Sequence, residues 1–158
     1  MKKVNVYGDE WDVVRDRPGW QWKRLGVGDR LGAKGIGAGL YELSPGQKTF
    51  PYHLHYNREE WLVVVAGEPT LRSPEGEQRL EAGDCVAFPR GPAGAHQIRN
   101  DTDVAVRLLI LSSEPEADVV AYPDSGKIGA MALVPGEEQP FRLIVREDSA
   151  VDYFEGED

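Results

Sequence analysis

Apolar residues recur in short runs between turn residues from Leu40 onward, a pattern typical of an all-β domain. Proline and glycine punctuate these runs, as in the turn Ser44-Pro45-Gly46 and in Ser73-Pro74-Glu75-Gly76, where their positions suit a hairpin. Short strands separated by turns predict a sandwich or a barrel. We expect strands at Leu40–Leu43, Trp61–Ala66, Thr70–Arg72, Gln78–Glu81, Cys85–Phe88, His96–Asn100, Val104–Leu111 and Phe141–Arg146.

The run from Trp61 to Ala66 is apolar on both faces of its predicted strand. If Glu60 points inward, Leu62 and Val64 point inward too, while Trp61, Val63 and Val65 face outward. An outer face of this kind needs a cover. We expect that cover to be either a homodimer interface or the N-terminal segment.

Residues 1–37 hold three of the four tryptophans and lead into the glycine-rich stretch 32–39. Trp20-Gln21-Trp22 alternates as a strand would, and we expect this aromatic arm to pack across the barrel or onto a second subunit. The glycine spacing does not match a dinucleotide-binding fingerprint, and a strand rather than a helix follows it. We therefore expect a flexible loop at the glycines and no phosphate site.

Composition narrows the class of partner. With 158 residues and 41% apolar content, the chain suits one domain with its own core. A net charge of −9 argues against nucleic acid and against an anionic membrane surface, so we expect a small-molecule partner. The single cysteine and a start without an apolar signal region lead us to expect residence in the cytoplasm.

The three histidines and one glutamate are spaced as metal ligands. His53 and His55 lie two residues apart, so in a strand both imidazoles face one side. Glu60 follows after a short turn, and His96 comes from a distant segment. Three imidazoles and a carboxylate are suitable donors for a transition metal, so the sequence predicts a shared metal site at these four residues.

These residues carry a resemblance to the cupins. The first cupin motif reads Gly46, His53-x-His55, Glu60 and Gly67, and the second reads Gly83, Pro89, Gly91, His96 and Asn100. One extra residue follows Gly46 and two precede His96, where loops vary. The six residues between Glu60 and Gly67 match the family spacing and favour Glu60 over Glu59 as the ligand.

The resemblance implies an all-β, double-stranded β-helix (the cupin jelly-roll barrel), with dimers common in the family. We expect a single domain over residues 1–158, with an N-terminal arm at 1–37, a barrel core at 38–112 and a C-terminal extension at 113–158. We expect this extension to pack on the barrel or on a dimer mate, which we favour over a catalytic loop.

The predicted ligand set leaves open positions on the ion, as catalytic sites do. We expect one divalent transition metal per chain, either iron, manganese, nickel, cobalt, copper or zinc. A structural zinc would more often use cysteine, and we expect Cys85 to be a buried, inert thiol. Polar residues that could surround the site are Tyr52, Arg90 and Arg107 near the motifs and Tyr41 on the preceding strand, and Arg107 could orient a substrate carboxylate or phosphate. For Arg107 an outward ion pair with Glu42 or Glu81 is the favoured alternative.

Two functional hypotheses follow. In the first, the protein is a metal-dependent enzyme of the isomerase, epimerase or dioxygenase type that acts on a small polar or sugar-like metabolite. In the second, it is a non-catalytic cupin that binds or senses a small molecule. The complete ligand set favours the enzyme, but the fold alone cannot select the reaction.

Overall fold

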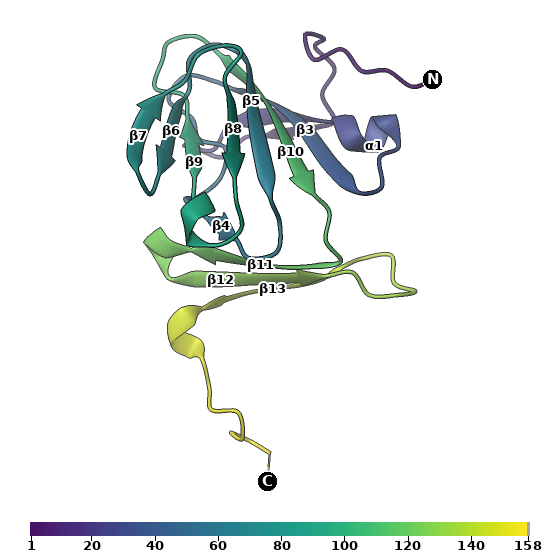
Figure 1. The fold of residues 1–158 in the computed structure, drawn as a ribbon, viewed down its shortest axis with the longest axis vertical. Coiled ribbons are helices and arrows are strands. Elements are labelled where there is room, and N and C mark those ends of the chain that lie inside the picture. Colours follow the sequence, from purple (N-terminus) through teal and green to yellow (C-terminus); the bar gives the residue numbers. More distant parts are fainter. Residues whose placement is uncertain (158) are drawn as a thin grey trace.

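The computed structural model describes residues 1–157, which form three antiparallel sheets arranged as a jelly-roll barrel with an added layer at one end (Figure 1). The large sheet has the order β1-β2-β3-β10-β5-β8, a small sheet has the order β7-β6-β9, and a third has the order β13-β12-β11-β4. The strands are β1 (Val13–Arg15), β2 (Trp22–Gly26), β3 (Ile36–Leu43), β4 (Leu54–His55), β5 (Glu60–Ala66), β6 (Thr70–Ser73), β7 (Gly76–Arg79), β8 (Cys85–Phe88), β9 (Gln97–Arg99), β10 (Val106–Ser113), β11 (Ala117–Tyr122), β12 (Lys127–Ala132) and β13 (Phe141–Arg146). The helical segments are α1 (Val27–Leu31) and the 3-10 turns η1 (Pro92–Gly94), η2 (Pro123–Ser125) and η3 (Glu147–Ser149).

The core lies between the large and small sheets. Alternation places Leu62 and Val64 of β5 inward, at 0% and 1% exposure, as predicted from the inward Glu60. Trp22, Tyr41 and Phe50 meet edge to face inside the barrel, and the Trp22 Nε1–H donates to the carbonyl of Thr49 at 2.9 Å. Trp22 therefore belongs to the barrel core, because β2 is a strand of the large sheet.

The outer face of the large sheet is covered by the N-terminal segment. Val4, Val6 and Trp11 pack against a cluster that also contains Val65 and Leu109. Arg107 points to this side, where it forms an ion pair with Glu42 at 2.8 Å. The alternative of an outward ion pair with Glu42 is thus the one observed for Arg107. Trp61 lies beyond this cover and remains 52% exposed.

Most predicted strands are present, with shifts of a few residues. The hairpin forms with Ser73 opposite Gly76, and β8 and β13 have the predicted bounds. Two expectations were wrong. Cys85 is exposed, because it and Ala87 face outward while Val86 and Phe88 face the core. The glycine-rich stretch is not all loop, because β3 already begins at Ile36.

The C-terminal extension packs on the barrel, as expected. β11 pairs with the two-residue strand β4, placing Val120 opposite His55. In Figure 1, β11, β12 and β13 cross the lower end of the barrel, and β13 is exposed along its whole length. None of the helices in residues 1–157 combines the length and the apolar character that a membrane span requires.

Candidate metal centre

Backbone pairing between two distant segments brings the histidines together. His53 and His96 form an antiparallel bridge, in which each backbone N–H donates to the other residue's carbonyl, at 3.1 and 2.8 Å. The turn before His96 needs the glycine at position 94, since a Cβ there would lie 1.7 Å from the carbonyl oxygen of Pro89. His55 is in β4, and Glu60 begins β5.

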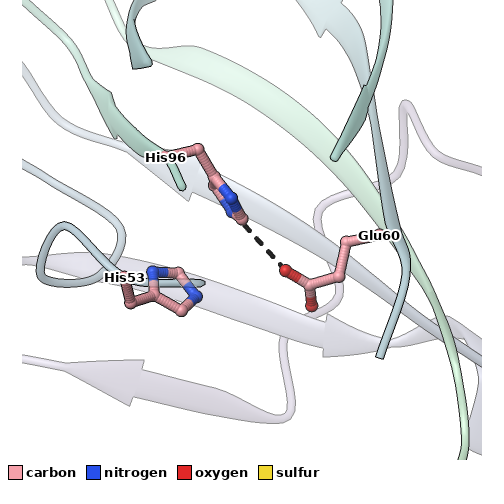
Figure 2. Close-up of side chains that lie close together, drawn as sticks. All are labelled: His53, Glu60 and His96. Carbon is pink, nitrogen blue, oxygen red and sulfur yellow. Dashed lines mark ion pairs between the residues drawn. The ribbon is translucent and has the colours of Figure 1, made fainter. Parts of the chain in front are cut away.

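The four predicted ligand residues all line one cavity. Potential ligand atoms of His53, Glu60 and His96 lie within 4.8 Å of one another (Figure 2). Glu60 Oε2 lies 3.5 Å from His96 Nε2 and also 3.5 Å from His55 Nε2. His55 therefore faces the same carboxylate, although it is outside the tightest three-residue cluster. Glu59, the competing residue, is exposed and bonds Trp61 instead.

Each imidazole is oriented by a hydrogen bond at Nδ1. In His53 the partner is the carbonyl of Pro51, and in His96 it is the carbonyl of Gly94, both at 2.9 Å. In His55 the partner is the carboxylate of Asp118. Because these partners only accept, each ring donates its Nδ1–H, and a neutral ring held in this way presents the Nε2 lone pair to the cavity. Metal-binding histidines have this arrangement, so the residues present fit a bound cation.

Burial keeps His53 and His96 neutral. It lowers the pKa of His53 to about 4 and that of His96 to about 3, with the neighbouring histidines adding to the effect. The ring of Phe88 stacks on His96 with 3.7 Å between ring centroids. Burial also raises the pKa of Glu60, which favours its protonated form in the absence of a cation. Near neutral pH the site therefore offers unprotonated nitrogen donors.

The cavity has a volume of about 320 Å³ and also contains polar groups that the sequence did not single out. Those that line it include Arg24, Arg58, Glu114 and Tyr122. Asp118 was also not predicted, and its carboxylate accepts a hydrogen bond from His55 Nδ1. A signal for Asp118 did exist, since a charge within the apolar run Ala117–Tyr122 needs a partner when buried.

Of the four polar residues named as neighbours of the site, only Tyr41 lines this cavity. Tyr52 lies under the guanidinium of Arg72, 3.9 Å from ring to cation, beside a separate depression. Arg90 is exposed, and Arg107 is on the outer face. For Tyr52, the residue before His53, strand alternation explains why it points away from the cavity. For Arg107 the favoured alternative, the outward ion pair with Glu42, is the one observed.

A family model for the cupin domain matches residues 39–112. A candidate sugar phosphate isomerase from Acidithiobacillus ferrooxidans is 30% identical, and the match covers 85% of this chain and 82% of that one with a TM-score of 0.73. This chain belongs to the cupin superfamily.

Two further structures extend the comparison. The cupin is also similar to a sugar phosphate isomerase of the same superfamily from Silicibacter pomeroyi, at 25% identity over 94% of each chain and a TM-score of 0.79. A polyketide cyclase from Streptomyces resistomycificus, 22% identical over 72% of this chain and 79% of its own, shares the fold at a TM-score of 0.59. No curated protein matches the sequence.

Proposed function

We propose that this cupin is a metal-dependent enzyme that isomerises or epimerises a small, polar, sugar-like metabolite. Its ligands to one divalent transition metal would be His53, His55, Glu60 and His96. The observation that carries the proposal is that all three imidazoles are held by hydrogen bonds at Nδ1, which leaves Nε2 as the available ligand atom, and line a cavity that Glu60 also lines. The two relatives named as sugar phosphate isomerases support this reaction class over dioxygenation, because they match nearly the whole chain.

The metal would supply Lewis acidity, polarising a carbonyl or hydroxyl oxygen of the substrate. The chain's own residues would bind and orient the substrate. Burial raises the pKa values of Tyr41 and Tyr122, so both phenols stay protonated near neutral pH and can donate hydrogen bonds to sugar oxygens. Phe88 and Ile110 line the same cavity and limit the water that reaches it.

We also propose that the active unit is a homodimer of single-domain chains. The exposed Trp61 lies with Ile36 and Leu111 around a shallow apolar depression on the face that the N-terminal segment leaves uncovered. A second copy would remove this surface from water.

Metal content tests the ligand assignment. Protein purified without an affinity tag or chelator should carry about one equivalent of a transition metal per chain by elemental analysis. Glu60→Gln and His96→Ala should lose most of it and stay folded. Glu59→Gln is the matched control, because it makes the same change one residue away on an exposed side chain. Equal metal content in the two glutamine variants would refute the ligand assignment. If the unmodified protein holds no metal even after reconstitution, the metal-dependent enzyme is ruled out.

Turnover separates the enzyme from a binding protein. The metal-loaded protein, incubated in D₂O with a panel of aldose and ketose phosphates, should exchange a carbon-bound hydrogen or interconvert one pair, as followed by proton NMR. Full metal content, with ligand binding but no exchange or interconversion across the panel, would contradict the proposed enzyme and favour a non-catalytic, ligand-sensing cupin.

A further inference from the structure

Two glycines of β3 shape the wall of the cavity. Gly37 and Gly39 lie on the inner face, since Gly37 is opposite Ser112 and Gly39 is opposite Ile110, and both partners line the cavity. A Cβ at Gly37 would lie 2.2 Å from Glu114 Oε1 and 2.5 Å from Ser112 Oγ. A Cβ at Gly39 would lie 2.8 Å from Tyr41 Cε2 and 3.3 Å from Arg24 Nε. The glycine-rich stretch therefore makes room for polar side chains beside the metal centre.

Arg58 is a cation in this space with unused hydrogen-bonding capacity. Its Nη1 makes only long contacts, of 3.4 Å to Ser112 Oγ and 3.4 Å to Glu114 Oε1. Its Nε is buried and has no hydrogen-bond partner in the described part of the chain; Asp118 Oδ2 is 3.7 Å away. A buried donor without a partner costs free energy unless a ligand satisfies it.

Arg24 is the second cation. It lies on β2 opposite Tyr41 and lines the same cavity. Among residues 1–157 no carboxylate lies within ion-pairing distance of its guanidinium. The other arginines without an ion pair are exposed, whereas Arg24 is half-buried; they are Arg15, Arg17, Arg90, Arg142 and Arg146. In a chain with a net charge of −9, an arginine left unpaired beside a cavity is notable.

The cavity opens on the side of these arginines. The side chain of Glu114 is 41% exposed, whereas those of His96 and His55 are 5% and 13% exposed. A bound divalent ion, Arg24 and Arg58 would together bring four positive charges to the cavity if the histidines are neutral. The carboxylates of Glu60, Glu114 and Asp118 supply three negative charges, which leaves an excess of one positive charge. An anionic group on the substrate would restore the balance.

We propose that Arg24 and Arg58 bind the phosphate group of a phosphorylated substrate whose sugar end reaches the metal centre. This inference rests on the proposed function and names its substrate class. Guanidinium groups bind phosphate oxygens through paired, charge-assisted hydrogen bonds. Glu114, held to Arg58 only by a long contact and well exposed, can swing into water when the phosphate arrives.

A second basic depression, lined by Lys48, Arg72 and Lys127, fits this role less well. Its Arg72 is already bonded through both terminal nitrogens to the carboxylate of Asp124, at 2.6 and 2.8 Å. None of the three histidines of the metal centre lines that depression. A phosphate bound there would therefore lie outside the cavity in which the proposed reaction takes place.

Calorimetric titration with inorganic phosphate tests the inference, using protein with its metal and protein treated with a chelator. Arg24→Gln and Arg58→Gln should each weaken phosphate binding at least about tenfold, and Arg24→Lys should recover part of the loss. Arg142→Gln on β13 is the matched control, because it removes one exposed arginine outside the cavity. It should bind phosphate within about twofold of the parent protein.

The outcomes separate this inference from the proposed function. Two results would overturn the phosphate site alone, in a protein that carries about one equivalent of metal. One is phosphate binding that neither arginine substitution weakens, and the other is phosphate binding that is lost when the metal is removed. Phosphate binding that depends on the arginines in a protein unable to hold metal would overturn the enzyme alone. Displacement of the phosphate by a hexose phosphate supports the substrate class, whereas stronger displacement by the corresponding uronate would refute it.

Discussion

The carboxylate of Asp118 controls which nitrogen of His55 faces the cavity, and Asp118→Asn tests that control. Asp118 is 4% exposed; one oxygen accepts from His55 Nδ1 and the other from the backbone N–H of Asn57 at 3.1 Å. An asparagine offers one oxygen and one NH₂ group, so in either orientation it loses one of these bonds. When the NH₂ group faces the imidazole, the ring must carry its proton on Nε2, which points that proton at the metal position.

Loss of such an orienting partner typically weakens metal binding by about 10- to 100-fold, or about 1.4–2.7 kcal/mol. We expect a weakening in this range for Asp118→Asn in a competition titration of Co²⁺ or Zn²⁺ against a chromophoric chelator. Asp124→Asn is the matched control, because Asp124 also accepts a side-chain hydrogen bond, from Arg72, but lies outside the cavity. A folded Asp118→Asn protein with the metal affinity of the control would refute the orienting role.

Two further predictions concern stability. The folded pKa values of about 4 for His53 and about 3 for His96 lie below the unfolded value of 6.5, so the unfolded chain binds more protons as the pH falls below 6.5. The two histidines together should cost metal-free protein about 4 kcal/mol of unfolding free energy between about pH 7 and pH 5. Glu60, with its raised pKa, should offset part of this loss, and equal urea midpoints at the two pH values would contradict the prediction. Gly39→Ala should cost about 1–3 kcal/mol by crowding Tyr41, measured by urea unfolding. Gly35→Ala, with nothing within 4 Å of its Cβ, should be neutral within about 0.5 kcal/mol, and equal costs for both would refute the crowding.

Local patterns predicted much of the barrel and the inward direction of the ligand residues. The two-residue spacing of His53 and His55 places both on one side, and the short turn after His55 returns Glu60 to them at the start of β5. The Pro-Glu turn specifies its hairpin. The side that Cys85 faces was not predictable in this way, because Cys85–Phe88 contains no polar residue to indicate which face is buried. The choice between the N-terminal segment and a second subunit as the cover of Val65 likewise required the tertiary structure.

The partners of the metal centre were the least predictable part. Asp118 reaches His55 across 63 residues because β11 pairs with β4, and nothing in either segment specifies that pairing. Arg24 enters the cavity because β2 joins the large sheet, although the sequence suggested an arm there. Nothing in the local sequence around Gly37 and Gly39 indicated that they would form the wall of a cavity.

The pairing of β11 with β4 also determines when the site can be completed during protein synthesis. The ribosome makes His53, His55 and Glu60 early, but the carboxylate that orients His55 and the ring of Tyr122 follow some sixty residues later. A nascent chain that ends after β10 already contains all four proposed ligands without the strand that holds one of them in place. Tight binding of the proposed metal would thus require synthesis past β11, so a product truncated before β11 should bind that metal more weakly than the full chain.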